Sequence, residues 1–315
     1  MRVLVTGAAG FVGRHLIREL ETAGHSLVLV DVRPPAPAGS DQYLFIAADV
    51  TDPPSVESAF TRARPDACVH LAGIAYVPVG WRDPIRTLQV NLLGTLAVLE
   101  SVRRVAPDCR TLVVTSAEIY GRDDPGHPLT EDAPLQPQNP YAVSKAGADI
   151  ATLLSARHYQ IPCLTARPAN HCGPGQSSSF VVPAFARQLA EIKLGLRPAE
   201  MKVGNLESLR TFIDVRDVVR AYRLLLEKGT PGKAYNVAGE KRIRIGDLLE
   251  ILCEVSGVRP RLVTDPDRYR PTDSVPLLDT SRLRQETGWE PKLSLSQTLQ
   301  DVFQYELQQL RGEHT

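Results

Sequence analysis

The sequence predicts a protein of the α/β class, built as a doubly wound parallel sheet with a smaller C-terminal α/β domain. Short apolar runs alternate with amphipathic helical patterns through the first half of the chain, as in parallel sheets covered by helices on both faces. A glycine-rich turn joins the first apolar run to the first helical pattern. After residue 168 the periodicity loosens and irregular, glycine-containing segments begin, which indicates the second domain.

Composition argues against some classes of partner. Lysine plus arginine and aspartate plus glutamate number 36 each among 315 residues, so no overall charge attracts nucleic acid or an anionic membrane. No apolar run approaches the length that crosses a bilayer. Five scattered cysteines without a C-x-x-C pair predict reduced, structural thiols. Because Met1 leads directly into the first strand, with no room for a signal peptide, we expect a cytoplasmic protein.

The first unit reads strand, glycine turn, helix, strand, acid. Its apolar strands are Val3–Val5 and Leu27–Val30, and Asp31 follows the second. The turn and the start of the helix contribute Gly7, Gly10, Phe11, Val12 and Gly13. This order predicts a dinucleotide-binding (Rossmann) unit, in which glycines allow a tight turn, close backbone approach to the diphosphate, and close helix packing. The first helical N–H groups and the helix dipole then face the phosphates.

Asp31 bears on the choice of cofactor. At the end of the second strand its carboxylate is placed to accept hydrogen bonds from the adenosine ribose. The same charge repels a 2′-phosphate and favours NAD(H). Arg33 lies two residues further on and is able to pair with such a phosphate. NAD(H) is therefore the favoured cofactor, and NADP(H) stays open.

The remaining elements follow in the order that this fold requires. We predict further strands at Tyr43–Ala48, Ala67–Leu71, Leu112–Thr115, Cys163–Ala166 and Tyr235–Val237. We predict helices at Pro53–Ala63, Trp81–Val105, Tyr141–Tyr159, Val181–Leu194 and Ile245–Val255, with two more near Ser281 and Ser294. We also predict a helix that is capped by Asp214 and runs to Lys228. Residues 1–168 plus 211–237 then form the dinucleotide-binding domain, and residues 169–210 plus 238–315 form the smaller domain.

Two strand ends contribute further candidate cofactor residues. Asp49 and Val50 follow the third strand, where an acid is able to meet an adenine amino group; a helix-capping acid is the alternative. Leu71, Ala72 and Gly73 close the fourth strand, where small residues admit a ligand.

A phenol and an ammonium form the candidate catalytic pair. Tyr141 and Lys145 lie four residues apart, on one face of a predicted helix. An ammonium near a phenol favours phenolate and lowers the pKa of the phenol, which suits proton transfer near neutral pH. Ser116, after the fifth strand, is placed to donate a hydrogen bond to the same substrate oxygen. A solvated surface pair is the alternative for Tyr141 and Lys145, but the serine and the glycine turn favour hydride transfer between a nicotinamide and a ketone.

With these motifs the chain resembles the extended short-chain dehydrogenase/reductases of the NAD-dependent epimerase/dehydratase family, over nearly its whole length. The resemblance implies that Ser116, Tyr141 and Lys145 are the catalytic trio and that the three glycines hold the cofactor diphosphate. It implies that ribose, adenine and nicotinamide are held by Asp31, by Asp49 with Val50, and by Ala72 with Gly73. It also implies a homodimer whose bundle is formed by the helices predicted at Trp81–Val105 and Tyr141–Tyr159.

The second half is similar to the GDP-mannose branch of that family. The matching segments are R-P-A-N-H-C-G-P-G-Q at 167–176, K-V-G-N-L-E at 202–207, R-T-F-I-D-V-R-D at 210–217 and R-P-T-D at 270–273. Within the branch the pattern is most similar to the GDP-4-keto-6-deoxy-D-mannose reductases, which yield GDP-D-rhamnose. The resemblance thus implies reduction of the C4 ketone by NAD(P)H, with Tyr141 as proton donor. It implies contacts with the nucleotide sugar from Ser116, Asn170, Phe180, Val181, Arg210, Arg270 and Asp273.

Simpler explanations exist for some of these residues. Arginine forks suit diphosphate oxygens, but Arg210 also has Glu207 as a candidate surface partner. Arg270 lies among other charged residues, where a solvated cluster is the alternative. His171 and Cys172 lack a third ligand at suitable spacing, so no metal site is predicted.

Two other functions stay open on sequence alone. Glu118 occupies the position at which GDP-mannose 4,6-dehydratases carry a glutamate, so a dehydratase with Glu118 as base, or another nucleotide-sugar epimerase or dehydratase, is the first alternative. Those dehydratases usually carry Thr at the position of Ser116, which favours the reductase. A dinucleotide sensor without catalysis is the second alternative, although loss of Tyr141 or Lys145 would be its expected signature.

Overall fold

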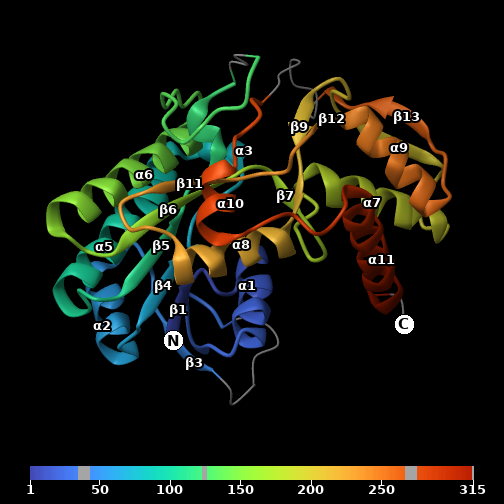
Figure 1. Ribbon diagram of the computed structural model, residues 1–315. Coiled ribbons are helices and arrows are strands. Elements are labelled where there is room, and N and C mark those ends of the chain that lie inside the picture. Colours follow the sequence, from blue (N-terminus) through green and yellow to red (C-terminus); the bar gives the residue numbers. More distant parts are fainter. Residues whose placement is uncertain (35–42, 123–125, 267–274, 314–315) are drawn as a thin grey trace.

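A computed structural model describes residues 1–34, 43–122, 126–266 and 275–313. Within these residues, seven parallel strands form one sheet in the order β11-β6-β5-β4-β1-β2-β3 (Figure 1). The strands are β1 (Arg2–Thr6), β2 (Ser26–Asp31), β3 (Leu44–Ala47), β4 (Ala67–His70), β5 (Arg110–Val114), β6 (Cys163–Pro168) and β11 (Ala234–Val237). The predicted fold class is confirmed. The strand order changes direction between β1 and β4, and such switch points bind ligands at the carboxyl ends of the strands.

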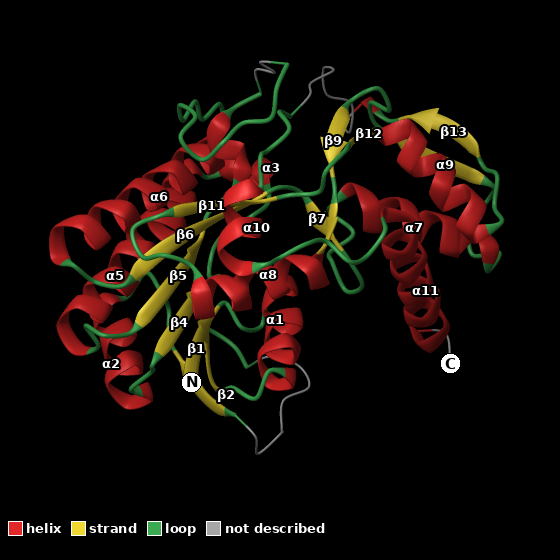
Figure 2. Ribbon diagram, viewed as in Figure 1, coloured by secondary structure: helices red, strands yellow, loops and turns green. Residues whose placement is uncertain are grey.

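Helices cover both faces of the sheet, and alternate residues of a strand enter different cores. On β1, Val3 and Val5 pack with α1 (Phe11–Thr22) and α8 (Val215–Lys228). Leu4 between them packs with α2 (Pro53–Ala63) and α5 (Gly94–Val105) on the other face. Figure 2 shows α1 and α8 on one side of the strands and α2, α5 and α6 (Pro140–Tyr159) on the other.

The prediction of one regular helix over Trp81–Val105 is wrong. α3 (Val77–Arg82) ends before Asp83, because α4 (Pro84–Leu88) begins at a proline that has no N–H to continue the earlier helix. The Asp83 side chain instead caps α4, accepting a backbone N–H at 3.0 Å. A π-helical turn, η1 (Gln89–Leu93), then leads into α5. Such turns occur frequently at functional sites.

A second lobe lies beside the sheet, and its core is formed by three helices (Figure 1). These are α7 (Val181–Lys193), α9 (Ile245–Ser256) and α11 (Leu295–Glu313). Short strands pair around them as β8 (Glu200–Val203) with β13 (Arg261–Thr264), β9 (Leu209–Thr211) with β12 (Arg242–Arg244), and β7 (His171–Cys172) with β10 (Ile213–Asp214). The Asp214 side chain caps α8, as predicted, by accepting the N–H of Arg216 at 2.7 Å.

One late segment returns to the sheet. Leu283, in α10 (Ser281–Thr287), and Trp289 are buried in the same core as β1. The Trp289 indole donates to the Asp217 carbonyl of α8 at 2.9 Å. This segment therefore packs on the sheet, although the sequence-based division assigns it to the smaller domain; the division as a whole stays a prediction. No helix in the described ranges is long and apolar enough to span a membrane.

Candidate active site

The glycine turn forms a narrow backbone cradle at the start of α1. Gly7 has φ +69°, and a Cβ there would lie 2.6 Å from the Ala72 nitrogen. A Cβ at Gly13 would lie 2.5 Å from the Ala8 carbonyl oxygen, so the helix approaches the turn too closely for a side chain. Gly10 is the N-cap residue and supplies no side-chain cap to the first amides of α1. A cradle of this shape fits a cofactor diphosphate.

The acids after β2 and β3 are held by local hydrogen bonds. The Asp31 carboxylate accepts the N–H of Ala9 at 3.0 Å, which places it at the edge of the glycine turn, and the N–H of Arg33 at 3.4 Å. Asp49 accepts the N–H and the hydroxyl of Thr51, both at 2.8 Å, and these bonds lower the pKa of Asp49. Asp49 thus caps its own turn, and the neighbouring Val50 is buried.

The segment after β4, Leu71 to Gly73, lies against the candidate catalytic lysine. A Cβ at Gly73 would lie 3.0 Å from Asn91 Oδ1 and 3.4 Å from Lys145 Nζ. Ala72 donates its N–H to the Thr6 hydroxyl at 3.3 Å, which joins this segment to the end of β1. The structure therefore brings Gly73, one of the residues predicted on the nicotinamide side, next to Lys145.

The Ser116 side chain lies next to the Tyr141 phenol and affects its pKa. Ser116 caps a short 3-10 helix, η2 (Ala117–Tyr120), and its Oγ accepts the N–H of Glu118 at 3.1 Å. Its own O–H is then available to donate, and its hydrogen bond to Tyr141 lowers the pKa of the phenol. Burial has the larger, opposite effect and raises the pKa of Tyr141 to about 12. The phenol is consequently protonated at neutral pH.

The expectation that Lys145 lowers the pKa of the phenol is not met. Lys145 Nζ donates to the Val114 carbonyl at 2.8 Å. Burial lowers the pKa of Lys145 to about 8. The two side chains do share a helix face, but the end of β5 offers the ammonium a backbone acceptor, and desolvation dominates the pKa of the phenol.

Glu118 belongs to the same group of side chains. Asn139, the N-cap residue of α6, donates from Nδ2 to Glu118 Oε2 at 3.3 Å and accepts the N–H of Ala142 at 2.8 Å. The carboxylate charge of Glu118 adds to the upward shift in the pKa of Tyr141. Glu118 is thus tied to the start of the helix that carries Tyr141.

The candidate substrate residues come from segments around the second lobe. Asn170 follows β6, and Phe180 caps α7 just before Val181. The Phe180 ring packs edge-on against Tyr76, with ring centroids 5.6 Å apart. Arg210 lies on β9, and its proposed surface partner Glu207 instead pairs with Arg244 at 3.2 Å. Arg270 and Asp273 lie outside the described residues.

Sequence reasoning missed two sets of contacts around the site. Asn91, in η1, accepts the N–H of Ile74 at 2.8 Å and donates to the Ile74 carbonyl at 3.0 Å and to Ser144 Oγ at 2.9 Å. A polar residue within an apolar helical pattern is the only local signal for it. Arg14 of α1 donates to the Gly175 carbonyl at 2.9 Å. Because the two residues are 161 positions apart in the sequence, no local pattern predicts this contact.

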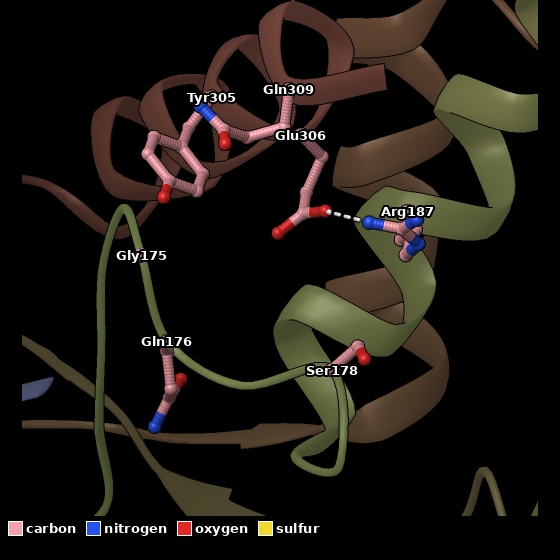
Figure 3. A pocket seen from close by; sticks show the side chains of 7 residues that line it. All are labelled: Gly175, Gln176, Ser178, Arg187, Tyr305, Glu306 and Gln309. Carbon is pink, nitrogen blue, oxygen red and sulfur yellow. Dashed lines mark ion pairs between the residues drawn. The ribbon is translucent and has the colours of Figure 1, made fainter. Parts of the chain in front are cut away.

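A separate polar pocket lies between α7, α11 and the loop at 175–178 (Figure 3). Its lining includes the pair Arg187 and Glu306, whose Nη1 and Oε2 atoms are 3.6 Å apart. The pocket contains none of the candidate catalytic residues. Among the described residues, no group of three or more His, Cys, Asp or Glu side chains is arranged to hold a metal ion. His171 instead makes a hydrogen bond through Nδ1 with the Ala169 carbonyl at 3.0 Å.

Comparisons with known proteins place the chain in a family. The family model for GDP-mannose 4,6 dehydratase matches residues 4–302. GDP-6-deoxy-D-mannose reductase from Pseudomonas aeruginosa is 37% identical, across 96% of this chain and 95% of the relative. A dTDP-glucose 4,6-dehydratase from Xanthomonas campestris is 29% identical across 93% of this chain and 90% of the relative.

Solved structures agree with this assignment. RMD from Pseudomonas aeruginosa complexed with NADPH superposes with a TM-score of 0.86 at 36% identity, covering 98% of this chain and 99% of that one. A UDP-glucose 4-epimerase from Thermotoga maritima, solved with UDP-glucose, gives a TM-score of 0.87 at 28% identity, covering 98% of this chain and 100% of that one. With a family model over nearly its whole length and a relative above one third identity, the chain belongs to the GDP-mannose 4,6-dehydratase family of extended short-chain dehydrogenase/reductases.

Proposed function

We propose that this protein is an NAD(P)H-dependent reductase that converts GDP-4-keto-6-deoxy-D-mannose to GDP-D-rhamnose by reducing the C4 ketone. One observation carries the proposal: a buried, protonated Tyr141 in contact with Ser116, next to a strand-end segment that borders Lys145. The similarity to a GDP-6-deoxy-D-mannose reductase supports the substrate class. A phenol that keeps its proton suits delivery of that proton to a ketone oxygen.

The chain's own groups fit the two halves of this reaction. The reduced nicotinamide, when bound, supplies the hydride. Tyr141 donates its proton to the C4 oxygen, and Ser116 polarises the carbonyl by donating a hydrogen bond to that oxygen. Lys145, held against the Val114 carbonyl at 2.8 Å beside Gly73, is placed to bind the nicotinamide ribose. Orientation of these groups, rather than a strong acid, then lowers the barrier.

The cofactor is held by the glycine cradle and Asp31. The Asp31 carboxylate, fixed to the N–H of Ala9 at 3.0 Å, favours a free ribose diol and therefore NADH. Arg33 is exposed two residues away and suits a 2′-phosphate, and the similar structure from Pseudomonas aeruginosa holds NADPH. Dissociation constants of NADH and NADPH, measured for Asp31→Asn and Arg33→Ala, separate the roles of the two residues. We expect Asp31→Asn to weaken the binding of NADH and Arg33→Ala to weaken the binding of NADPH. Adenine would lie by Asp49 and Val50.

The nucleotide sugar is held by a second group of residues in this proposal. Its members are Asn170, Phe180, Val181, Arg210, Arg270 and Asp273. Arginine forks bind the two charges of the diphosphate, and aromatic or aliphatic side chains cover the apolar faces of base and sugar. The edge-on contact of Phe180 with Tyr76 at 5.6 Å supports a position for Phe180 close to α3, whose Gly80 packs against Tyr141.

A 4,6-dehydratase activity is the second candidate, because Glu118 lies beside the candidate trio. Its bond from Asn139 at 3.3 Å would orient a carboxylate base. The dehydratase must first oxidise C4, which requires Tyr141 to accept a proton rather than to donate one. The reductase is favoured because the 37% identical relative is a GDP-6-deoxy-D-mannose reductase.

The decisive experiment supplies GDP-4-keto-6-deoxy-D-mannose with NADH or NADPH and follows reduced nicotinamide by absorbance. Steady consumption with formation of GDP-rhamnose supports the proposal; binding without turnover indicates a sensor. GDP-mannose with oxidised cofactor tests the dehydratase, and appearance of the keto sugar would replace the reductase. Tyr141→Phe should lower kcat by about a thousandfold with cofactor affinity kept, and full activity in that variant would refute the role of Tyr141.

We also propose a homodimer. Apolar side chains are exposed on α6, where Val143, Ile150 and Leu154 are 46, 56 and 58% exposed, and on the neighbouring helix at Leu93 and Leu96. Exposed apolar side chains on neighbouring helices suit contact with a second copy of the chain. The cytoplasm is the proposed compartment, since all five cysteines, which lie in described segments, are free and buried and free thiols persist in reducing compartments.

A further inference from the structure

A buried ion pair links the elements that carry the candidate catalytic groups. Arg167, near the end of β6, donates from Nε and Nη2 to the two carboxylate oxygens of Asp149 at 3.0 and 2.6 Å. The exposed fractions of the two side chains are 4% and 0%. Asp149 belongs to α6, one helical turn after Lys145. The pair therefore joins the sheet to the helix that presents Tyr141 and Lys145.

The same pair holds the chain on both sides of Ser116. Before it, the Thr115 hydroxyl lies within donating distance of Asp149 Oδ1, at 3.2 Å, and of the Ala166 carbonyl on β6, at 3.0 Å. After it, the Tyr120 hydroxyl at the end of η2 accepts from Arg167 Nη1 at 2.7 Å. The guanidinium carbon also lies 5.3 Å from the centroid of the Tyr120 ring. Ser116 thus lies between two residues, Thr115 and Tyr120, that each make a hydrogen bond to the same ion pair.

The rest of the network fixes which group the Tyr120 hydroxyl accepts from and which group it donates to. Because arginine only donates, the hydroxyl must use its own hydrogen elsewhere, and it donates to Asn236 Oδ1 at 2.8 Å. Arg167 Nη1 also donates to the Glu131 carbonyl at 2.7 Å, and the N–H of Asn236 donates to Glu131 Oε1 at 2.9 Å. A buried network with its donors and acceptors matched in this way is rigid.

We propose that Arg167, acting through Asp149 and Tyr120, is the positioning residue that sets the separation of Ser116 and Tyr141. The inference rests on the proposed function in so far as these two side chains act on the substrate carbonyl. Arg167 touches neither reacting group; it holds η2 and α6 at a defined distance across the end of β5. A misplacement of about 1 Å in such a site lowers the rate by about a hundredfold.

Tyr120→Phe tests the proposal with little change in volume. It removes the bond from Arg167 to η2 and leaves the ion pair with Asp149 intact. Tyr235→Phe is the matched control, because the Tyr235 hydroxyl is likewise paired, with Glu286 and with the N–H of Thr230, the latter at 2.7 Å, but on β11 away from Ser116. Both variants lose a buried hydroxyl and should lose similar stability.

The expected result is a split between catalysis and binding. Tyr120→Phe lowers kcat about tenfold or more, while the KM for the sugar nucleotide and the cofactor dissociation constant stay within about twofold. Tyr235→Phe keeps kcat within about twofold of the native protein. Equal kcat in the two variants, or a change confined to KM, overturns the proposal.

A second pair of variants removes the risk that a charge change merely unfolds the protein. Arg167→Met and Asp149→Leu each leave one buried charge unpaired and lower Tm, whereas the double variant replaces the pair by apolar groups and recovers most of Tm. A double variant that regains Tm but keeps kcat about tenfold low or lower supports positioning. Native kcat in the double variant refutes it. If Tyr141→Phe is itself fully active, the proposed function fails; if Tyr141→Phe is inactive while Tyr120→Phe is normal, this inference alone fails.

Discussion

At the scale of single residues, burial decides which protonation states the site contains. Tyr141 and Lys145 are both buried, and desolvation opposes the charged form of each. It raises the pKa of Tyr141 to about 12 and lowers the pKa of Lys145 to about 8. The site without its ligands therefore holds a neutral phenol and a lysine that titrates near physiological pH. The spacing of the two residues predicts their neighbourhood, whereas the depth of the site sets their charges.

Lys145 predicts a pH dependence of stability. Burial lowers the pKa of Lys145 from 10.5 to about 8, so between these values the unfolded chain binds more protons than the folded one, and the free energy of unfolding rises with pH. Lys145→Met removes this term. In urea titrations without cofactor, the variant should gain up to about 3 kcal/mol relative to the native protein near neutral pH. The gain should shrink as the pH rises from about 8 to 10.5, the folded and unfolded pKa values of Lys145. A gain independent of pH would show that the ammonium is not destabilised.

Gly13 predicts a loss of both stability and cofactor binding. A Cβ at Gly13 would lie 2.5 Å from the Ala8 carbonyl oxygen, so Gly13→Ala must push α1 away from the turn. We expect a loss of about 1–3 kcal/mol in unfolding free energy and weaker binding of both NADH and NADPH by fluorescence titration. Gly312→Ala in α11 is the control, since a Cβ there meets no atom within 4 Å. Native cofactor affinity in Gly13→Ala would contradict the cradle.

At the scale of elements, the irregular helix before β5 shows where a sequence pattern is insufficient. Apolar residues recur at helical spacing across Trp81–Val105, yet the chain breaks before Pro84 and widens to a π turn at Gln89–Leu93. The turn places the Asn91 amide against both backbone groups of Ile74, at 2.8 and 3.0 Å. The irregularity thus anchors the segment that borders Lys145.

Asn91→Leu tests this anchor. The change leaves the buried polar groups of Ile74 without their partner, so we expect a loss of about 2–3 kcal/mol in unfolding free energy and a lower kcat, as Gly73 is no longer held beside Lys145. Glu100→Ala on α5, whose carboxylate makes a surface ion pair with Arg103, should change stability by less than about 1 kcal/mol. Urea unfolding and steady-state kinetics measure both. Native kcat in Asn91→Leu would show that Asn91 does not support the site.

At the scale of the whole molecule, α6 and η1–α5 have two faces with different roles. Their inner faces carry Asn91, Tyr141 and Lys145, which are buried, while their outer faces expose residues such as Ile150 and Leu154. One pair of helices is therefore proposed to build both the active site and the contact with a second copy. Assembly and catalysis would then be coupled through α6.

Ile150→Glu combined with Leu154→Glu should convert the proposed dimer to a monomer. The change places carboxylates in an apolar contact without partners. A buried unpaired charge costs about 2–5 kcal/mol, so the association should be weakened by several kcal/mol. Light scattering after size exclusion gives the mass. Leu262→Glu, at a side chain 44% exposed on β13 of the second lobe, should leave the mass unchanged. A native mass in the double variant would place the interface elsewhere.

The sequence alone determined the features that depend on local spacing: the glycine turn, most strand and helix positions, the cap of Asp214, and the Tyr141–Lys145 face. These follow from backbone conformation and periodicity over a few residues. It also indicated the family, because the motifs lie at characteristic spacings along the whole chain.

Only the tertiary structure decided how distant segments pair. Lys145 meets Val114, 31 residues away, and Asn91 meets Ile74, 17 residues away. Arg167 pairs with Asp149, 18 residues away, and with Tyr120, 47 residues away. The burial of a side chain and its hydrogen-bond partners depend on which segments the folded chain brings together. No local sequence pattern specifies these tertiary contacts. The pKa of Tyr141, and with it the proton that the proposed reaction uses, was therefore set by the fold rather than by the spacing of Tyr141 and Lys145.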